Sequence, residues 1–438
     1  MIDTKEFKNR RKRLMDMIGS DSIAILPTAS IIVRNRDVEF PFRPDSDFFY
    51  LTGYPEPEAV LVLIPDRKEG ESILFCRERD EKMEAWHGRR SGLDGAISIY
   101  SVDDAFPIED MDDILPGLIE GHERIFYNMG SDQNFDQRVL GWVNQIRGKV
   151  RVGAIAPDEF ISLNHFLHEM RLYKSRYEIK LMRQAAKISA KAHIRAMRNC
   201  RPGMYEYQLE GELISEFIQN GARYTAYPPI VGSGQNACIL HYTNNNDKII
   251  DGDLLLIDSG AEYQCYASDI TRTFPVNGKF SDAQRDIYNL VLSAQTAALN
   301  EIKPGKHWND PHDAAVRVLT EGMVGLGILE GDPDELIKNK DYAKYYMHRT
   351  GHWLGMDVHD VGDYKLDGEW RMLEAGMVMT VEPGLYLPAN SKDLSEHWQN
   401  IGVRIEDDVL VTKDGYDILS KDAPKTIDEI EELMADAA

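Results

Sequence analysis

The chain has 438 residues, and its 50 basic and 73 acidic side chains give a formal net charge of −23 at pH 7. This length allows two domains with substantial cores, and so acidic a surface argues against binding to nucleic acid or to anionic membranes. The chain has no apolar run of the roughly 18 residues that a membrane helix needs, no apolar core of a secretory signal and no CxxC pair among its four cysteines. We therefore expect a cytoplasmic protein with small or cationic partners.

The first domain is expected to cover residues 1–172, where short apolar runs alternate with helical patterns. This alternation is typical of an α/β domain. Helices are expected over 4–19 and near 132–147. The runs rich in β-branched and aromatic residues predict strands over 23–26, 48–52, 59–64, 73–76 and 125–128.

The second domain is expected to cover residues 173–438. Ser175 is followed three residues later by Glu178, which is a capping-box signature, and the apolar periodicity behind it predicts a long helix. Further helices are expected over 205–219, 282–302 and 311–324, and residues 426–436 are expected to form a short acidic tail helix or a frayed end. A strand is expected within 228–243, ending at His241. The order helix, helix, strands then occurs twice, which suggests two related half-domains.

The stretch 253–274 is the centre around which the second domain is organised. An apolar run ends at Asp258, and the chain returns through Asp269, so the pattern predicts a hairpin with a carboxylate on each arm. Two carboxylates in a site of low dielectric repel each other and lose hydration. We therefore expect a positively charged group between them.

The same chemistry occurs a second time along the chain. GMVMTVEPG repeats the spacing of GDLLLIDSG, so that Glu382 corresponds to Asp258. A strand expected over 402–411 then carries Glu406 as the counterpart of Asp269. We interpret this as an internal repeat in which each half gives two carboxylates to one shared centre.

Three of the 12 histidines fall in the segment HRTGHWLGMDVH, at His348, His352 and His359. Its glycines make a regular helix doubtful, so at most one of His348 and His352 is expected to bind a metal. His241 and His359, each near the end of an expected strand, can be satisfied structural histidines, which is the more common outcome for an isolated histidine. Arg404 is expected either to hold a neighbouring acid in place or to form a core ion pair.

Each of these acids, taken alone, is an ordinary residue at a turn or a strand end. Their matched spacing in two copies, together with the histidines between, predicts a metal centre. Oxygen ligands with one imidazole favour two divalent ions of the manganese type over a thiolate-bound zinc. Such a pair activates water and polarises a carbonyl, so we expect hydrolysis, with neutral histidines stabilising an oxyanion or passing a proton.

The segments DSG, SDITRTF, GHWLGMDVHDVG, TVEPG and GVRIED closely resemble the pita-bread metallopeptidases and, among them, the bacterial aminopeptidase P family. The resemblance extends over nearly the whole chain, including NRDVEFPFRPDSDFFYLTGYPEPEAVLVL and VGSGQNACILHYT. It implies an α/β N-terminal domain followed by an α+β catalytic domain with an internal pseudo-two-fold repeat, related to creatinase and methionine aminopeptidase.

The resemblance implies metal ligands at Asp258, Asp269, His352, Glu382 and Glu406. Asp258 would bind one metal through both oxygens, Asp269 and Glu406 would bridge the pair, and His352 and Glu382 would complete the other. A hydroxide between the metals is the implied nucleophile, with Glu382 taking its proton. Manganese is the expected metal, and cobalt and zinc are the alternatives.

The resemblance also implies catalytic roles outside the metal ligands. His241, His348 and His359 match the family's substrate-binding and proton-shuttling histidines, and Arg404 matches its arginine beside the bridging glutamate. Trp86 resembles a tryptophan that reaches a neighbouring subunit's site in tetrameric members. We therefore expect a homo-oligomer, either a dimer or a tetramer.

The implied reaction releases the N-terminal residue from peptides with proline in second position. A prolidase, which is a dipeptidase with the same ligands, is the nearest alternative. A catalytically inactive binding protein and a metal-free creatinase-like hydrolase fit less well, because all five implied ligands are present. Residues 363–372 (DYKLDGEWRM) depart from the family pattern, which leaves the wall of the substrate pocket open.

Overall fold

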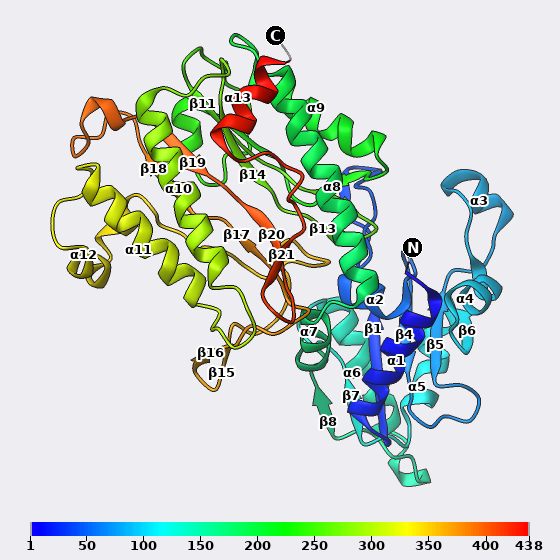
Figure 1. The fold of residues 1–438 in the computed structure, drawn as a ribbon. Coiled ribbons are helices and arrows are strands. Elements are labelled where there is room, and N and C mark those ends of the chain that lie inside the picture. The colour runs from blue at the N-terminus through cyan, green and yellow to red at the C-terminus, as the bar shows by residue number, and fades with distance from the viewer. Residues whose placement is uncertain (1, 437–438) are drawn as a thin grey trace. The chain divides into compact units, whose positions relative to one another are not determined.

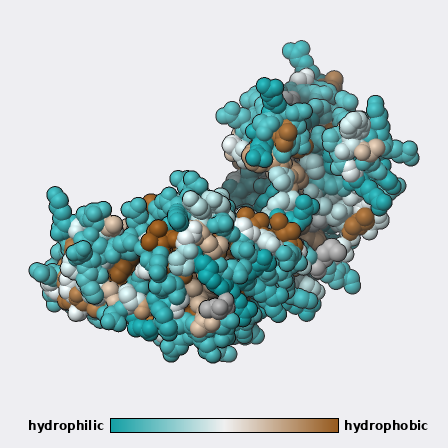
Figure 2. Space-filling model, turned by 90° about the horizontal axis from the view of Figure 1, so that it is seen from above, coloured by the Kyte–Doolittle hydropathy of each residue, from teal (hydrophilic) through white to brown (hydrophobic). Residues whose placement is uncertain are grey.

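The computed structural model describes residues 2–436 and divides the chain into two compact units, Met1–Met170 and Arg171–Ala438 (Figure 1). On the face seen in Figure 2, hydrophilic residues predominate and apolar residues form smaller groups between them. Among the described residues, none of the helices is both long and apolar enough to cross a bilayer.

The N-terminal unit is built on a mixed sheet with the strand order β6-β5-β4-β1-β7-β8. Its strands are β1 (Ser22–Pro27), β4 (Val60–Leu63), β5 (Ser72–Cys76), β6 (Asp104–Pro107), β7 (Arg124–Phe126) and β8 (Glu159–Ile161), and a separate hairpin joins β2 (Val33–Asn35) to β3 (Val38–Glu39). The helices are α1 (Thr4–Ile18), α2 (Ser46–Thr52), α3 (Glu81–His87), α4 (Gly92–Tyr100), α5 (Met111–Ile119), α6 (Gln133–Arg147) and α7 (Asn164–Leu172). The helices expected over 4–19 and 132–147 are confirmed.

The strand expected over 48–52 is wrong, because these residues form helix α2. The Asp45 side chain accepts a hydrogen bond from the Phe48 N–H at 2.9 Å, which caps the first turn. At the other end, Gly53 adopts a left-handed φ of 64° and its N–H bonds to the Phe49 carbonyl. Local capping at both ends therefore outweighs the β-propensity of the aromatic residues between them.

In the C-terminal unit, α8 packs beside α9 and α10 packs beside α11. The helices are α8 (Arg176–Asn199), α9 (Glu206–Gln219), α10 (Asp282–Asn300), α11 (Asp310–Gly325), α12 (Pro333–Asn339) and α13 (Ile427–Ala435). The predicted capping box at the start of α8 is confirmed, with Ser175 and Glu178 bonding each other's backbone N–H groups. Buried apolar side chains from both halves, such as Ile188, Leu255 and Val403, share one core.

The strands of this unit form several small antiparallel sheets. They are β9 (Tyr224–Thr225), β10 (Ile230–Ser233), β11 (Leu254–Asp258), β12 (Ala261–Tyr263), β13 (Tyr266–Ala267), β14 (Thr271–Pro275), β15 (Lys365–Leu366), β16 (Glu369–Trp370), β17 (Val378–Val381), β18 (Gly384–Leu387), β19 (Ile401–Arg404), β20 (Asp407–Val411) and β21 (Tyr416–Ile418). In Figure 1, the long helices α8 and α10 run along the two sides of β14 and β20. The predicted order of helix, helix, strands is confirmed in the first half, whereas the second half has a third helix, α12, between α11 and its strands.

The pairing expected over 253–274 is confirmed, but the segment is not a single hairpin. Strands β11 and β14 pair antiparallel, with Asp258 opposite Thr271, but a second hairpin of β12 and β13 lies between them. Asp269 lies just before β14. Gly260 permits the crossing, because a Cβ there would lie 1.7 Å from the Ser268 carbonyl oxygen.

Two other expected strands are shorter than predicted. The strand over 402–411 is two strands, because β19 pairs with β18 and β20 with β17, and the chain changes sheets at Glu406. The strand expected to end at His241 ends at Ser233 and gives way to a short 3₁₀ helix. The buried Glu206 carboxylate accepts the Ser233 N–H at 2.8 Å and thereby takes a backbone donor away from continued strand pairing.

Candidate metal centre

The predicted metal-binding side chains of both half-domains line one cavity of about 1070 Å³. Buried strands bring Asp258 to the end of β11, Glu382 to the residue after β17 and Glu406 to the junction of β19 and β20. Oxygen and nitrogen atoms of Asp269, His352 and Glu406 lie within 4.8 Å of one another. The structure therefore brings together donors that lie as far apart in sequence as residues 258 and 406.

His352 lies between the two acids nearest to it. Its Nε2 atom is 3.4 Å from an Asp269 carboxylate oxygen and 3.6 Å from a Glu382 carboxylate oxygen. Its Nδ1 lies 3.0 Å from the Trp353 carbonyl, which can only accept, so Nδ1 carries the proton of the neutral ring. Neutral His352 would thus direct an Nε2 lone pair at the acids, as a metal ligand must.

Mutual repulsion and burial control the titration of the four acids. Burial raises the pKa of Glu382 to about 7, and burial with the neighbouring acids raises the pKa of Glu406 well above its usual range. Burial also raises the pKa of Asp258, which Arg404 opposes. Burial would raise the pKa of Asp269 too, but the hydrogen bond and charge of His352 outweigh it and leave that pKa lowered.

This donor set fits a pair of divalent cations. Within residues 2–436, three buried carboxylates and the half-buried Glu382 face only Arg404 and His352 as charged partners at short range, which leaves an excess of negative charge in a low-dielectric cavity. Burial alone would lower the pKa of His352, but Asp269 and Glu382 raise it to about 9. Oxygen-rich donors with one imidazole suit hard or borderline divalent ions.

Arg404 contacts Asp258 directly and Glu406 only through a hydroxyl. Its Nη2 donates to Asp258 Oδ2 at 2.7 Å, and its Nε donates to the Thr271 hydroxyl at 3.1 Å. That hydroxyl in turn donates to Glu406 Oε2 at 2.6 Å. This contact fits both interpretations left open by the sequence, because Arg404 holds a neighbouring acid through a buried ion pair.

The hydrogen bonds of His348 define its tautomer. Its Nδ1 lies 2.7 Å from the Arg349 carbonyl and therefore donates to it, while Nε2 lies 2.8 Å from the Tyr386 hydroxyl. Burial lowers the pKa of His348 to about 3, so the ring is neutral and Nε2 accepts from Tyr386. The same hydroxyl accepts a hydrogen bond from Arg404 Nη1 at 2.9 Å.

The other two predicted histidines also line the cavity. The ring of His359 meets that of His352 edge-on at a centroid distance of 4.4 Å, and burial lowers its pKa. His241 reaches the cavity from the loop after the 3₁₀ helix 234–238. Trp86, by contrast, belongs to the N-terminal unit and is 77% exposed.

Sequence reasoning missed two polar groups at the centre. The Tyr227 hydroxyl lies 2.6 Å from Asp258 Oδ1 and also bonds Asp269, and its single proton can serve only one of them at a time. The Thr380 hydroxyl accepts from the His352 N–H and donates to Glu382, each at 3.1 Å. Strand alternation could have predicted Thr380, which lies two residues before Glu382, whereas no spacing pattern indicates Tyr227.

Comparison with known families gives two matches along the chain. Residues 180–413 match Metallopeptidase family M24, and residues 7–127 match the Aminopeptidase P N-terminal domain. The predicted resemblance and fold class, an α/β N-terminal domain followed by an α+β pita-bread domain, are confirmed.

Proteins with similar sequences and structures share this arrangement over their full length. The chain is 46% identical to the Xaa-Pro aminopeptidase of Escherichia coli, over 100% of this chain and 99% of the relative. A solved structure of Pseudomonas aeruginosa aminopeptidase PepP matches with 59% identity and a TM-score of 0.99, over 100% of this chain and 99% of that one. Proline aminopeptidase P II from Yersinia pestis matches with 46% identity and a TM-score of 0.96, over 99% and 100%. The chain therefore belongs to metallopeptidase family M24 and carries an aminopeptidase P N-terminal domain ahead of its peptidase domain.

Proposed function

We propose that the chain is a metal-dependent Xaa-Pro aminopeptidase, which releases the N-terminal residue from peptides with proline in second position. The observation that carries this proposal is the convergence of three buried carboxylates, the half-buried Glu382 and His352 on one cavity. Relatives of 46% and 44% identity that carry the name Xaa-Pro aminopeptidase support the substrate class.

We assign the metal site to Asp258, Asp269, His352, Glu382 and Glu406, with two manganese ions as its occupants. When bound, the ions would activate water and polarise the scissile carbonyl. Glu382 would take the proton from that water, since its carboxylate lies beside His352 and within 3.8 Å of His348. Arg404 and Thr271 would hold Asp258 and Glu406 in place.

Substrate contact is assigned mainly to His241 and His359. Within residues 2–436, no protein group occupies their ring nitrogens, whereas both nitrogens of His348 are already bonded. His348 would therefore act through its bond to Tyr386 as well as by lining the pocket. Apolar and aromatic side chains such as Trp308 and Tyr364 line the same cavity and would accommodate the proline ring.

The proposal extends to organisation and location. The N-terminal domain 1–172 and the catalytic domain 173–438 would work within a homo-oligomer, either a dimer or a tetramer. Its support is the exposure of Trp86, at 77%, and of Ile32 near the β2–β3 hairpin, at 65%. Light scattering of the wild type and of Trp86→Ser would test it, since a smaller assembly is expected for the variant. A cytoplasmic location suits the four free thiols.

The test of the function is an assay of metal-stripped protein reconstituted with manganese. Three substrates are compared: a Xaa-Pro-Xaa tripeptide, the matching Xaa-Pro dipeptide and a Xaa-Ala-Xaa control. Manganese-dependent cleavage of the tripeptide alone supports the aminopeptidase. Cleavage of the dipeptide alone would instead make the protein a prolidase, and the absence of cleavage with two metals bound would favour a binding protein.

A further inference from the structure

Two cationic side chains lie close to one aromatic ring at the wall of the metal cavity. Lys365 Nζ lies 4.4 Å from the centroid of the Trp370 ring, and the Arg349 guanidinium carbon lies 5.1 Å from the same centroid. All three residues line the cavity that contains the metal-ligand candidates. We name Arg349, Lys365 and Trp370 the cationic clamp.

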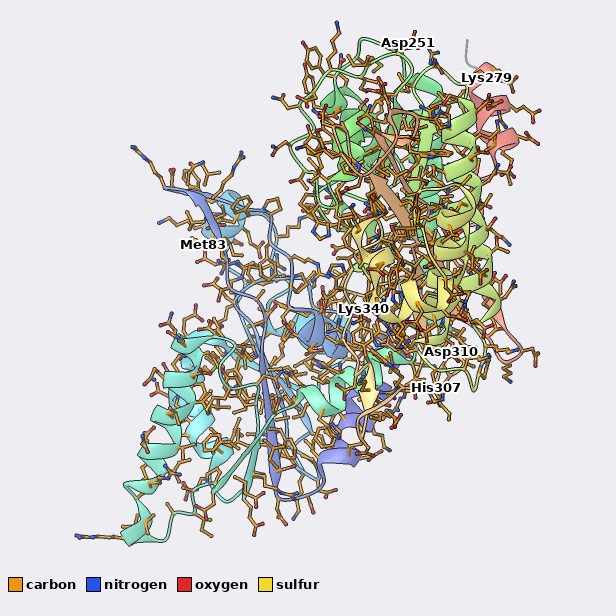
Figure 3. All side chains as sticks on the ribbon, turned by 90° about the vertical axis from the view of Figure 1, so that its left-hand side faces the viewer. Met83, Asp251, Lys279, His307, Asp310 and Lys340 are labelled. Carbon is orange, nitrogen blue, oxygen red and sulfur yellow. The ribbon has the colours of Figure 1, made fainter. Side chains whose placement is uncertain are left out.

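The clamp is built on anchored backbone. Lys365 and Trp370 are direct partners in the antiparallel pair of β15 and β16. The Trp370 carbonyl accepts a hydrogen bond from His307 Nδ1 at 2.8 Å, and the Arg371 carbonyl accepts the Trp308 N–H at 2.8 Å. His307 lies close to Asp310 in Figure 3, and its N–H donates to that carboxylate at 2.9 Å.

Arg349 belongs to the same wall through a different segment of the chain. It directly follows His348 and donates a hydrogen bond to the Asn309 side chain, on the loop that also carries His307. Arg349 and Lys365 both remain exposed to solvent, whereas the Trp370 ring is half-buried. The cation–π contacts with Trp370 therefore hold the charged groups of Arg349 and Lys365 in place, and both groups stay accessible to a ligand.

The charge at this wall is opposite to that of the chain as a whole. The net charge is −23, and the carboxylates deeper in the cavity are assigned to metal ions and to Arg404. Among the described residues that line the cavity, the remaining acid is Asp363, against Arg349 and Lys365. Among the lining residues at this wall, the two cations of the clamp therefore outnumber the one acid, which favours an anionic group over a cationic one beside the clamp.

A peptide substrate of an aminopeptidase carries different charges at its two ends. Its α-amino end is positive and would be repelled by the clamp, whereas the chain beyond the scissile bond can present a carboxylate. We propose that the cationic clamp binds a carboxylate of the substrate beyond the proline, so that the enzyme prefers such peptides. The inference rests on the proposed function. The carboxylate can be the free C-terminus of a tripeptide or an acidic side chain in third position.

Four manganese-dependent substrates separate these two sources: Ala-Pro-Ala, Ala-Pro-Ala-NH₂, Ala-Pro-Glu-NH₂ and Ala-Pro-Gln-NH₂. In each pair, we expect the wild type at low salt to have a kcat/KM about fivefold higher for the substrate that carries the carboxylate than for its neutral counterpart. The ratio of the two kcat/KM values should approach one at about 0.5 M salt, because exposed ion pairs are weak and screened. The first pair reports on a terminal carboxylate, and the second reports on an acidic side chain.

The variants Lys365→Gln, Arg349→Gln and their combination are then compared by the same ratios. We expect the combined variant to lose the preference. Lys340→Gln serves as the matched control, because Lys340 is exposed and is not among the residues that line the cavity, and the ratio should stay at the wild-type value. A wild type that cleaves both members of each pair equally, or a combined variant that keeps the preference, overturns the inference alone. A wild type that cleaves none of the four substrates overturns the proposed function instead.

Discussion

The guanidinium of Arg404 and the carboxylate of Asp258 lie 2.7 Å apart and join the two half-domains at the metal centre. Asp258 ends β11 of the first half, and Arg404 ends β19 of the second. Arg404 is 3% exposed and also holds the Tyr386 hydroxyl, so its position is defined from both sides. A change in this residue should therefore alter the geometry of both halves at once.

Replacing Arg404 by lysine is expected to lower kcat/KM for a Xaa-Pro-Xaa tripeptide by about 10- to 100-fold, the usual effect of removing a partner that orients a metal ligand. A lysine ammonium cannot bond Asp258, Tyr386 and Thr271 in the same fixed plane. Steady-state kinetics with manganese would measure the loss. Arg198→Lys, at an exposed position of α8, should leave kcat/KM unchanged, and a wild-type rate in Arg404→Lys would contradict the positioning role.

Replacing Asp269 by asparagine is expected to remove the activity together with bound metal, by at least about 100-fold in kcat/KM, since the amide carries no charge for a divalent ion. The fold should survive, because the Asp269 backbone N–H is held by Asp408 at 3.0 Å and does not depend on the side chain. Metal content by mass spectrometry and circular dichroism would be measured on the same sample. Full metal occupancy in the variant would rule out Asp269 as a ligand, and Asp251→Asn, at an exposed position, provides the control.

Asp258 and Glu382 could be predicted because each stands at the end of a strongly apolar run, and because the repeat gives the two acids the same spacing. Both are local signals. Tyr227 carries no such signal, since its hydroxyl acquires its partners only when β11 and β14 fold beside it. The same limit explains the strand expected over 48–52, where two capping residues outside the apolar run determine a helix.

The relation between Arg404 and Glu406 shows a further limit. Alternation along one strand predicts that both side chains point the same way. The chain passes from one sheet to another between them, and a hydrogen-bonded path through the Thr271 hydroxyl connects the two side chains. Thr271 lies more than 130 positions earlier in the chain. A change of sheet depends on which strands pair, and pairing is a property of the assembled core rather than of the local pattern.

Replacing Glu206 by glutamine is expected to weaken the loop that carries His241. The buried carboxylate accepts hydrogen bonds from Ser233 N–H and Asn236 on one oxygen and from Tyr242 and Asp247 N–H on the other. The NH₂ group of a glutamine side chain would face one of these pairs of donors, and a donor cannot accept their hydrogen bonds. We expect this to lower the free energy of unfolding by about 1–3 kcal/mol. Because the metal ligands are untouched, metal content should stay normal while KM rises. Glu330→Gln, at an exposed site, should change neither quantity, and an unchanged KM in Glu206→Gln would contradict the role.

Replacing Asp360 by asparagine is expected to destabilise the C-terminal unit by about 3–5 kcal/mol at neutral pH, because it leaves buried cations without their shared partner. Asp360 bonds Arg171 at 2.6 Å and Lys174 at 2.9 Å, and both its own side chain and that of Lys174 are 1% exposed. Burial alone would raise the pKa of Asp360, but the charges of Lys174 and Arg171 outweigh it and lower that pKa.

The pH dependence of that loss follows from the sign of the shift. A carboxylate with a pKa lower in the folded than in the unfolded chain stabilises the fold above the unfolded value of about 3.9, and this stabilisation disappears as the pH falls through the folded value. Urea unfolding of the wild type and of Asp360→Asn should therefore differ most near pH 7, and the difference should disappear as the pH falls through the folded pKa of Asp360. Asp363→Asn, at an exposed position of the same segment, should unfold like the wild type at each pH. A difference between wild type and Asp360→Asn that stays constant down to acid pH would show that the buried pair contributes through packing and not through charge.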